Sequence, residues 1–365
     1  MNSPLEHVDV LQIGGYPPPH GGVAIHVQEL AARLRARSIS CVVLNPAAAG
    51  APSEPGVLRF AGGRGRQFLA MLGAIWRLAP RAIHVHIAAG AQALPWVALF
   101  ARSMPLRTSL VTIHSGLFPA ALASARPWRR LLYRRSLDAF TWIIAVNPNI
   151  LDALSSLGIH PAKVRVIPAF FPVPAAAPAS PDQALARLRA QCDVLLFTSG
   201  FMHPDWGILS VARALHALNG VRAGLVVVQS GDTAPEYERE VRATLPDPAR
   251  ALFYQEVPHE RFLQILAASD IYVRASLYDG DSNAVREALS AGKSVVASDC
   301  VPRPPGCVLF RSASQPALDA ALSNLAAAGA QRNADAQASL ESSEQLLDLY
   351  QHLLGPSLCE RKVHA

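Results

Sequence analysis

The sequence predicts an α/β protein made of two doubly wound units, each a parallel sheet with helices on both faces. The chain has 365 residues, enough for about two domains of ordinary size. Strand-like and helix-like segments alternate along it, which is typical of parallel sheets. A proline-rich stretch at 168–182 interrupts the alternation, which then starts again. Two successive units therefore explain the pattern most economically.

Apolar runs and amphipathic periods define the individual elements. In the front half we predict strands at 8–15, 39–46, 81–90, 107–116 and 141–147, and helices at 21–37, 91–103 and 148–158. In the rear half we predict strands at 193–200, 222–231, 270–276 and 293–299, and helices at 206–220, 260–270 and 343–354. The predicted organisation is an N-terminal domain at 1–172, a linker at 173–190, a C-terminal domain at 191–330, and a helix and tail at 331–365. That last helix closes the second unit or crosses back to the first.

Composition excludes several protein classes. Hydrophobic residues make up 51% of the chain and charged residues 16%, so it is neither disordered nor fibrous. Five cysteines without a CxxC pair disfavour a disulfide framework or a zinc site. The first residues lack the plan of a signal peptide, and the longest apolar stretch, 82–101, is interrupted by polar residues and a proline. We expect a soluble, cytoplasmic protein.

Charge is distributed unevenly along the chain. Residues 1–175 hold 17 Lys and Arg against 6 Asp and Glu, whereas residues 176–365 hold 16 against 21. The basic front half favours an anionic partner, such as a lipid surface or a phosphate-bearing acceptor. Its densest segment is a predicted amphipathic helix whose candidate membrane contacts are Trp128, Arg129, Arg130, Arg134 and Arg135. An ordinary charged helix face is the alternative, and no motif supports nucleic-acid binding.

Ligands of open α/β sheets bind beyond the carboxyl ends of the strands, so we expect the chemistry in the loops that follow the strands. The first such loop contains Gly14, Gly15, Gly21 and Gly22 around three prolines. Its glycines allow the backbone to approach a phosphate or sugar, and the following helix offers free amides. The spacing is not that of a dinucleotide site, and a tight turn without a ligand is the alternative.

Histidines mark the ends of two predicted strands. His84 and His86 share one face of their strand, and His114 stands at a glycine-containing strand end. A structural role and a functional role are both open for each of them. No cluster of cysteines or carboxylates lies nearby in the sequence, which weakens a metal site.

The third segment, 278–299, carries the strongest signal. Asp281 or Ser282 can cap the helix that follows, and Gly292 can end it. Glu287 then lies about one turn into the helix, while Asp279 lies in the loop before it. Helix capping accounts for the Asp and Ser of the loop but not for both of these carboxylates.

Asp279 and Glu287, separated by seven residues and followed by AlaLeuSerAlaGly and a ValVal strand, resemble the Glu-x7-Glu signature of glycosyltransferase family 4. The resemblance spans nearly the whole chain, including the first glycine-rich loop, HisValHis, ThrIleHisSerGly and the ThrSerGly turn at 198–200. It implies the GT-B fold, in which two Rossmann-like domains face each other across a cleft. It also implies a retaining transfer of sugar from a nucleotide-sugar to an acceptor hydroxyl, with neither metal nor cofactor.

The resemblance also implies roles for individual residues. Glu287 would bind the donor ribose, Asp279 would lie near the donor sugar, and His114 would contact the reacting sugar and phosphate. The donor-binding residues implied are Gly14, Gly15, Gly21, Gly22, Gly200, Gly280, Asp281, Ser282, Asn283, Arg286 and Glu287. The catalytic residues that the resemblance implies are His114 and Asp279; to these we add Arg274, and Arg286 among the donor-binding residues is likewise our own candidate.

The chain departs from the family pattern in one respect. Phe201 and Trp206 stand where the family has an Arg and a Lys that neutralise the leaving diphosphate. Arg274 and Arg286 are the local replacements, because a guanidinium binds diphosphate well. Alternatively, Arg274 is a surface residue and Arg286 pairs with a loop carboxylate such as Asp281.

We expect a glycosyltransferase of surface polysaccharide biosynthesis, peripheral on the inner face of the cell membrane. Its partners would be a nucleotide-sugar donor and a lipid-linked or oligosaccharide acceptor, with no nucleic acid. One alternative is a nucleotide-sugar epimerase of the same fold. Another is a catalytically degenerate glycosyltransferase that serves as an assembly partner.

Overall fold

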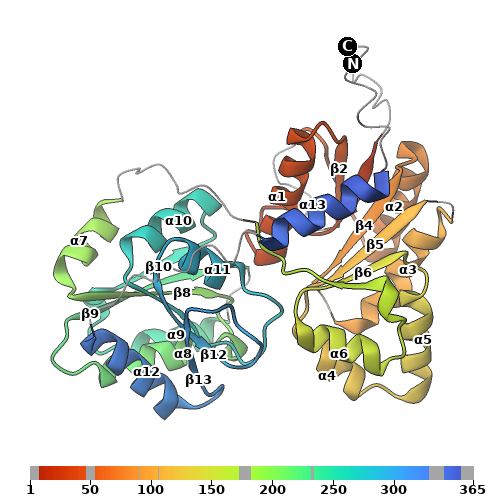
Figure 1. The fold of residues 1–365 in the computed structure, drawn as a ribbon. Helices are drawn as coiled ribbons and strands as arrows, with labels where there is room; N and C mark the ends of the chain where they lie inside the picture. The colour runs from red at the N-terminus through yellow and green to blue at the C-terminus, as the bar shows by residue number, and fades with distance from the viewer. Residues whose placement is uncertain are drawn as a thin grey trace. The chain divides into compact units, whose positions relative to one another are not determined.

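The computed structural model describes residues 8–46, 54–88, 90–105, 107–171, 182–231, 234–328 and 341–354. The chain divides into two compact units. Unit 1 comprises 1–18, 23–171 and 341–365, and unit 2 comprises 19–22 and 172–340. Each unit is built around one parallel sheet (Figure 1). Among the described helices, none combines the length and apolar character needed to cross a bilayer.

Unit 1 contains seven strands, and every pairing between them is parallel. In spatial order they are β3 (Val57–Arg59), β2 (Cys41–Asn45), β1 (Val10–Ile13), β4 (Ala82–Ile87), β5 (Thr108–Ile113), β6 (Trp142–Ala145) and β7 (Val164–Val166). The order reverses between β1 and β4, as it does in the Rossmann fold. The strand cores are continuous apolar runs because both faces of the sheet are covered.

Two layers of helices cover this sheet. One face packs against α1 (Gly22–Ala36) and α13 (Glu341–Leu354). The other packs against α2 (Arg64–Leu78), α3 (Leu94–Arg102), α4 (Phe118–Ala123), α5 (Pro127–Leu137) and α6 (Pro148–Ser156). Short 3-10 turns, η1 (Ala91–Ala93) and η2 (Pro161–Lys163), complete the unit. The C-terminal helix α13 therefore packs against unit 1 and does not close unit 2. These were the two alternatives that the sequence left open.

Unit 2 repeats the architecture with six parallel strands. In spatial order they are β10 (Ala251–Gln255), β9 (Ala223–Gln229), β8 (Val194–Gly200), β11 (Ile271–Arg274), β12 (Ser294–Ser298) and β13 (Cys307–Phe310). One face packs against α8 (Ile208–Ala214), α9 (Pro235–Thr244) and α12 (Gln315–Ala327). The other packs against α7 (Gln183–Gln191), α10 (His259–Ala268) and α11 (Asn283–Ser290). The remaining turns are η3 (Pro204–Trp206), η4 (Leu215–Ala217) and η5 (Pro248–Arg250).

The predicted fold class, two doubly wound parallel sheets, is confirmed. One boundary differs, because residues 183–190 of the predicted linker belong to α7. Asp182 begins this helix: its side chain accepts a hydrogen bond from the Leu185 amide at 2.7 Å. An aspartate at the N-cap is a sufficient local signal for a helix start, even after a proline-rich segment.

Candidate functional site

The predicted residues that follow strands β1, β4, β8 and β11 lie at the point in each sheet where the strand order reverses, whereas the predicted membrane contacts lie on α5. In unit 1 the chain leaves β1 at Gly14 and leaves β4 just after His86. In unit 2 the corresponding strands are β8, which ends at Gly200, and β11, which ends at Arg274. Ligands of doubly wound sheets bind at such switch points. Both units thus place their chemistry-bearing side chains where the fold provides a ligand site.

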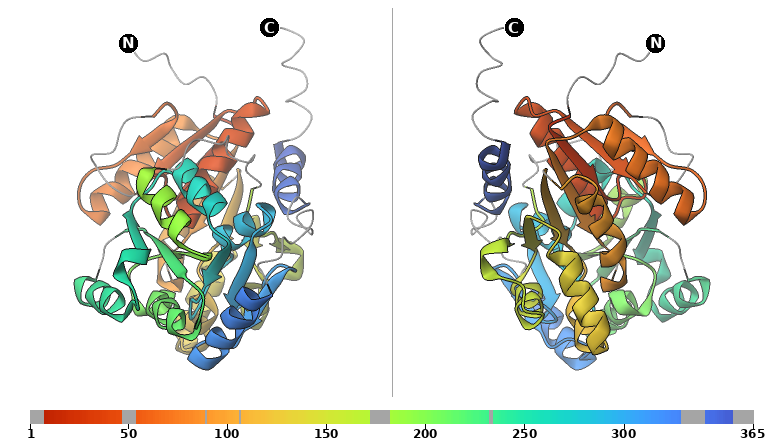
Figure 2. Two further views of the ribbon diagram at one scale, coloured as in Figure 1. Left: turned by 90° about the vertical axis from the view of Figure 1, so that its left-hand side faces the viewer. Right: turned by 90° about the vertical axis from the view of Figure 1, so that its right-hand side faces the viewer.

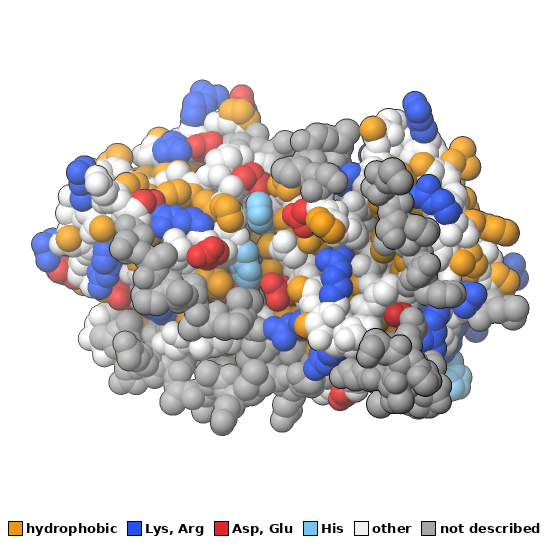
Figure 3. Space-filling view, turned by 90° about the horizontal axis from the view of Figure 1, so that it is seen from above, with side chains coloured by type: hydrophobic (Ala, Val, Ile, Leu, Met, Phe, Trp, Pro, Cys, Tyr) orange, Lys and Arg blue, Asp and Glu red, His pale blue; other side chains and the backbone are white. Residues whose placement is uncertain are grey.

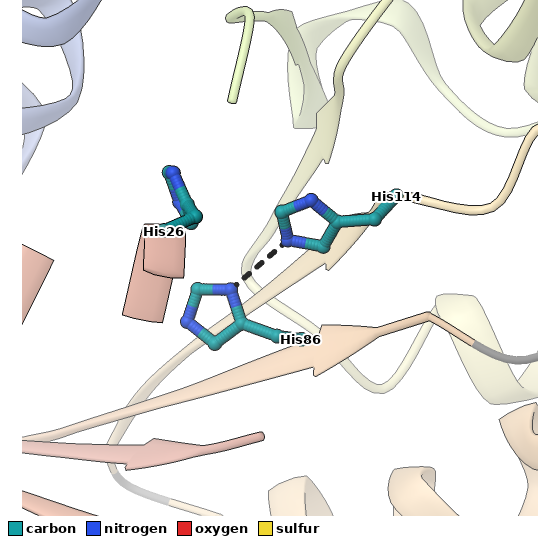
Figure 4. A group of neighbouring side chains, drawn as sticks. All are labelled: His26, His86 and His114. Carbon is teal, nitrogen blue, oxygen red and sulfur yellow. Dashed lines mark hydrogen bonds between the residues drawn. The ribbon is translucent and has the colours of Figure 1, made fainter. Parts of the chain in front are cut away.

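Three buried histidines meet at the switch point of unit 1: His26 from α1, His86 from the end of β4, and His114 just after β5 (Figure 4). The Nδ1 atom of His86 lies 3.1 Å from Nε2 of His114. On its other side, Nε2 of His86 lies 3.1 Å from Oε1 of Gln12. The ring of His26 lies edge-on to both of the other rings, with centroids 5.5 and 5.1 Å away.

The hydrogen bonds define which ring nitrogens carry protons. The amide nitrogen of Gln12 donates to Sγ of Cys41 at 3.3 Å, which turns Oε1 of Gln12 toward His86. His86 therefore carries its proton on Nε2, and its Nδ1 accepts a hydrogen bond from Nε2–H of His114. The chain Gln12–His86–His114 holds the ring of His114 in a defined orientation.

Burial keeps these imidazoles neutral. Desolvation lowers the pKa of His26 to about 4. It also lowers the pKa values of His86 and His114 well below the ordinary value, and the neighbouring rings add to the effect. A neutral imidazole offers one donor and one acceptor, and the donor of His114, Nε2–H, already binds His86, so Nδ1 of His114 is the atom that can accept a hydrogen bond at neutral pH.

His84 is a structural histidine. It is fully buried, its Nδ1 lies against the hydroxyl of Tyr350 on α13, and its Nε2 lies 2.7 Å from Oγ1 of Thr112. Of the two roles left open for this residue, the structure thus supports the packing role. Its partner on α13 lies 266 residues further along the chain.

Gly14 is required by packing against the histidines. A Cβ atom at this position would lie 3.0 Å from Cβ of His86 and 3.2 Å from Cγ2 of Val27. At Gly15 the nearest such atom would be 4.0 Å away, and at Gly21 and Gly22 none lies within 4 Å. Close packing thus accounts for Gly14, a side chain at Gly15 would make an ordinary contact with Ala24, and Gly21 and Gly22 face open space where a ligand could approach.

In unit 2, Arg274 and Asp279 form one buried ion pair rather than two separate reactive groups. Nε and Nη2 of Arg274 donate to the two carboxylate oxygens of Asp279 at 2.9 and 3.0 Å. A second guanidinium, that of Arg303, donates to the same carboxylate at 2.9 Å. The side chains of Arg274, Asp279 and Arg303 are 7%, 9% and 2% exposed. Two cations and one anion leave this group with a net charge of about +1.

The arginines keep Asp279 ionised. Burial alone would raise the pKa of its carboxyl, but the charges of Arg274 and Arg303 outweigh burial and lower this pKa to about 2. Asp279 is therefore a permanent anion at neutral pH whose oxygens are already shared by two guanidinium groups. The third nitrogen of Arg274, Nη1, donates to the carbonyl of Ser199 at 3.2 Å. All three nitrogens of Arg274 thus donate within the protein, and its side chain is buried, so it is not the surface residue of the alternative; its role toward the diphosphate stays a prediction.

Aromatic rings occupy the positions of the missing Arg and Lys. The ring of Trp206 lies over the Arg274 guanidinium at 4.3 Å and contacts the ring of Phe201 at 5.1 Å. Gly200 makes this possible: its φ is +156°, and a Cβ there would lie 2.2 Å from the Trp206 ring. Trp206 therefore packs onto the end of β8 and covers the cation beneath it.

Glu287 is the fifth of the eight residues of α11 and is buried. Its Oε1 lies 2.7 Å from Nε2 of His259, the first residue of α10. Ser282 caps α11 by accepting from the Val285 amide, as one of the two capping alternatives proposed. Arg286 donates to both carboxylate oxygens of Asp281, at 2.8 and 2.9 Å. Of the two roles left open for Arg286, the structure thus supports pairing with the loop carboxylate.

Four site residues carry no signal strong enough to find from the sequence: Gln12, His26, His259 and Arg303. Gln12 lies inside an apolar strand and His26 inside an amphipathic helix, where isolated polar residues are common. His259 and Arg303 lie 28 residues before and 24 residues after the side chains they contact. Only the tertiary fold brings them there.

The basic helix predicted at 126–135 is α5, and its candidate contacts differ in exposure. Trp128 is 57% exposed and the Arg129 guanidinium lies 5.2 Å from its ring. Arg134 and Arg135 are exposed as well. Arg130 is half-buried, because its guanidinium donates to the carbonyls of Leu122 and Ser156 at 2.8 Å each. Arg130 therefore ties helices together and is a poor surface contact.

Comparisons with family models match both units. Residues 20–172 match the model described as Glycosyltransferase Family 4, and residues 192–327 match the model described as Glycosyl transferases group 1. Together these segments cover all of the predicted site residues except Gly14 and Gly15. A comparison with curated proteins gave no match.

Solved structures share the architecture along nearly the whole chain. The HepE protein of Anabaena in complex with UDP and glucose is 17% identical with a TM-score of 0.70, covering 94% of this chain and 99% of its own. Sucrose-phosphate synthase of Thermosynechococcus elongatus is 19% identical with a TM-score of 0.67 and 97% of both chains covered. A trehalose-phosphate synthase of Burkholderia xenovorans with glucose-6-phosphate is 11% identical with a TM-score of 0.72, covering 95% and 100%. At these identities the likeness concerns the fold.

Proposed function

This chain belongs to the family 4 type of glycosyltransferases with the GT-B fold, and on that premise we propose how it works. It transfers a sugar, with retention, from a nucleotide-sugar to a hydroxyl of a lipid-linked or oligosaccharide acceptor of a surface polysaccharide. Unit 2 binds the donor and unit 1 the acceptor. The acceptor hydroxyl attacks the anomeric carbon on the face from which the diphosphate departs, and positive charge at that carbon is transient.

The observation that carries the donor assignment is the corner formed by Arg274, Asp279, Arg303 and Glu287 in unit 2. Within it, Arg274, Asp279 and Arg303 together carry a net charge of about +1, and α11 begins four residues after Asp279, so these three residues attract a diphosphate, whereas the carboxylate of Glu287 does not. Glu287 supplies the carboxylate for the ribose hydroxyls, since a carboxylate accepts two hydrogen bonds. Arg274 contributes through the positive electrostatic potential of the three-residue group, because all three of its nitrogens already donate hydrogen bonds within the protein.

One observation favours a second candidate, a degenerate glycosyltransferase that acts as an assembly partner. Phe201 and Trp206 replace two cations, and Trp206 covers Arg274. A leaving diphosphate then meets fewer donors than in the family pattern. If this second candidate is right, the protein binds neither UDP-, GDP- nor ADP-sugars and releases no nucleotide from them.

The deciding experiment is a donor-hydrolysis and binding screen over common UDP-, GDP- and ADP-sugars. For the preferred donor we expect Glu287→Ala to lower kcat/KM by about 10- to 100-fold, the loss of one hydrogen bond to a charged group. Glu240→Ala, which removes a half-exposed carboxylate paired with Arg213, is the control and should leave kcat/KM unchanged. A sugar returned with altered configuration in the absence of acceptor would instead indicate an epimerase.

His259→Ala separates a ribose contact from a structural role of Glu287. If Glu287 serves only to hold His259, both single variants lose the same activity and the double variant loses no more. If Glu287 binds the ribose, His259→Ala keeps most of the donor affinity that Glu287→Ala loses. Equal affinity of wild type and Glu287→Ala for every donor would contradict the assignment.

The membrane part of the proposal rests on a surface that we call the α2/α3/α5 face. Its exposed side chains are unusually large and apolar: Leu69, Trp76, Trp96, Leu99, Trp128 and Leu131, each 41–69% exposed. Phe68 of α2 contacts Trp96 of α3, and Arg102 of α3 donates to the Arg135 carbonyl of α5, so the helices form one layer. The right-hand view of Figure 2 looks onto this layer.

Charge on this face has one sign. None of α2, α3 and α5 contains an acidic residue, whereas α2 holds three arginines and α5 holds four. The space-filling view looks from above and does not face this layer, but at its right-hand end hydrophobic and basic side chains are intermixed (Figure 3). Exposed tryptophans with arginines around them are the composition of surfaces that lie in the interface of an anionic bilayer. The α2/α3/α5 face therefore holds unit 1 at the membrane, where a lipid-linked acceptor is found.

Vesicle co-sedimentation tests this face. Replacing Arg129, Arg134 and Arg135 by Gln should weaken binding to anionic vesicles by about a hundredfold, at about 1 kcal/mol for each arginine. Arg239→Gln, which removes a highly exposed arginine of unit 2, is the control. Binding should also fall with added salt, because exposed charges are screened. Equal binding by the triple variant, or binding that ignores lipid charge, would remove the membrane assignment while leaving the donor assignment intact.

A further inference from the structure

We propose that His26, His86 and His114 form a binding site for a transition-metal ion of the zinc class. The observation is geometric: one ring nitrogen from each of the three side chains lies within 4.8 Å of the other two, and all three residues are buried. Figure 4 shows the rings of His86 and His114 facing each other, with His26 beside them. The site lies at the switch point of unit 1 and differs from the donor corner of unit 2.

Two ligand atoms are already close to a metal-binding spacing. Nδ1 of His86 and Nε2 of His114 are 3.1 Å apart. Two nitrogens bound to one tetrahedral Zn²⁺ at about 2.0–2.1 Å are separated by about 3.3 Å. An ion inserted here replaces the hydrogen bond between the two rings. His114 then carries its proton on Nδ1 and presents the lone pair of Nε2, so no net proton is released.

His86 has the supporting partner that metal-binding histidines have. Its Nε2–H donates to Oε1 of Gln12, and Gln12 is itself held by Cys41 and by the Val27 carbonyl. Such a bond from the second ring nitrogen fixes the tautomer and aims the lone pair of the first at the ion. Gly14 completes the arrangement, because its lack of a Cβ lets His86 pack in this position.

His26 supplies the third ligand and is the least satisfied member of the cluster. It is 2% exposed, and among the described residues neither of its ring nitrogens makes a hydrogen bond of normal geometry. The backbone of Ala169 lies near enough to favour a proton on this ring, which accounts for one nitrogen at most. The buried ring of His26 thus has a nitrogen without a hydrogen bond of normal geometry near ring nitrogens of His86 and His114. Packing alone does not explain such a nitrogen, because buried polar atoms are usually hydrogen-bonded.

The donor set selects the class of ion. The three ligands are neutral imidazoles, which suit Zn²⁺, Co²⁺, Ni²⁺ and Cu²⁺, whereas Mg²⁺ and Ca²⁺ require oxygen ligands. Three protein ligands leave one position of a tetrahedral ion for water or an anion. A bound metal ion would also occupy Nε2 of His114, so we expect the metal to inhibit sugar transfer. That last consequence rests on the proposed function, whereas metal binding itself does not.

Titration of the tag-free, metal-stripped full chain with Co²⁺ and Zn²⁺ tests the site. We expect one equivalent of Co²⁺ to give the visible absorption of a tetrahedral nitrogen-ligated ion, and Zn²⁺ to displace it. His26→Ala should weaken Zn²⁺ binding measured by calorimetry by more than a hundredfold. Gln12→Leu, which removes only the supporting hydrogen bond, should weaken it by about 10- to 100-fold. His216→Ala, an exposed histidine of unit 2, is the matched control and should bind as wild type does.

A second measurement covers the risk that a variant folds poorly. Zn²⁺ should raise the melting temperature of wild type and of His216→Ala, but not of His26→Ala or His114→Ala variants that show native circular dichroism. Absence of a tetrahedral Co²⁺ spectrum in the wild type would overturn the site, as would undiminished Zn²⁺ affinity in His26→Ala. Because no donor is present in these titrations, loss of glycosyl transfer and loss of metal binding are told apart.

Discussion

At the scale of single residues, the protein tolerates a buried charge only where the charge is paired. Asp279 is 9% exposed and yet ionised, because two guanidinium groups bind its oxygens. Removing one member of such a group leaves the others without compensation in a low-dielectric setting. The family pattern has Glu at this position, and the shorter Asp fits the bidentate pair with Arg274.

We predict that Asp279→Ala lowers the free energy of unfolding by about 3–5 kcal/mol, because it leaves two buried arginines without their anion. Denaturant unfolding of the full chain measures this change. Asp193→Ala, which breaks a solvent-exposed pair with Arg222, is the control and should change stability little. A loss no larger than that of the control would show that the buried arginines find other partners. Because the native pKa of Asp279 is about 2, its contribution should be fully present above pH 4 and lost as pH falls toward 2.

At the scale of elements, the strands at the sheet edges escape sequence analysis while the central strands do not. The edge strands β3, β7, β10 and β13 are as short as several central strands, but unlike those strands they are largely half-buried or exposed. They lack the continuous apolar run that marks a strand covered on both faces. For α13 the reverse holds. The spacing of its apolar residues predicts a helix, but the sequence does not predict which unit the helix packs against.

We predict that Leu347→Ala in α13 destabilises unit 1 by about 2–5 kcal/mol. Leu347 is 1% exposed and packs with residues of α1 and the sheet, so truncation leaves a cavity in the core of that unit. Thermal and denaturant unfolding measure the loss. Gln351→Ala on the exposed side of the same helix should change stability by less than about 0.5 kcal/mol. Equal stability of the two variants would mean that α13 is not part of the core of unit 1.

At the scale of the whole molecule, the buried histidines couple folding to pH. Burial lowers the pKa of His84 to about 3 and that of His26 to about 4, whereas an unfolded chain binds protons near pH 6.5. Below that pH the unfolded state therefore holds more protons than the native state. Stability must fall as pH falls.

We predict that the free energy of unfolding changes little between pH 7 and pH 8 and decreases from about pH 6.5 down to about pH 4. The share of His26 alone is on the order of 3 kcal/mol, because one unit of pKa difference corresponds to about 1.4 kcal/mol. Denaturant unfolding at pH 7.5, 6 and 5 gives the slope. His26→Phe should make this slope shallower, while His216→Phe should not. A slope that His26→Phe leaves unchanged would contradict the assignment of a neutral His26.

Sequence patterns alone predict the two parallel α/β units, the glycosyltransferase signature around Asp279 and Glu287, and the departure at Phe201 and Trp206. These features are local: a strand, a cap or a spaced pair of carboxylates is encoded within about twenty residues. The tertiary structure alone decided that Arg303 joins Asp279, that His259 holds Glu287, and that His26 meets His86 and His114. Those contacts join residues 24 to 88 positions apart in the chain, and only the winding of each sheet brings them to one switch point.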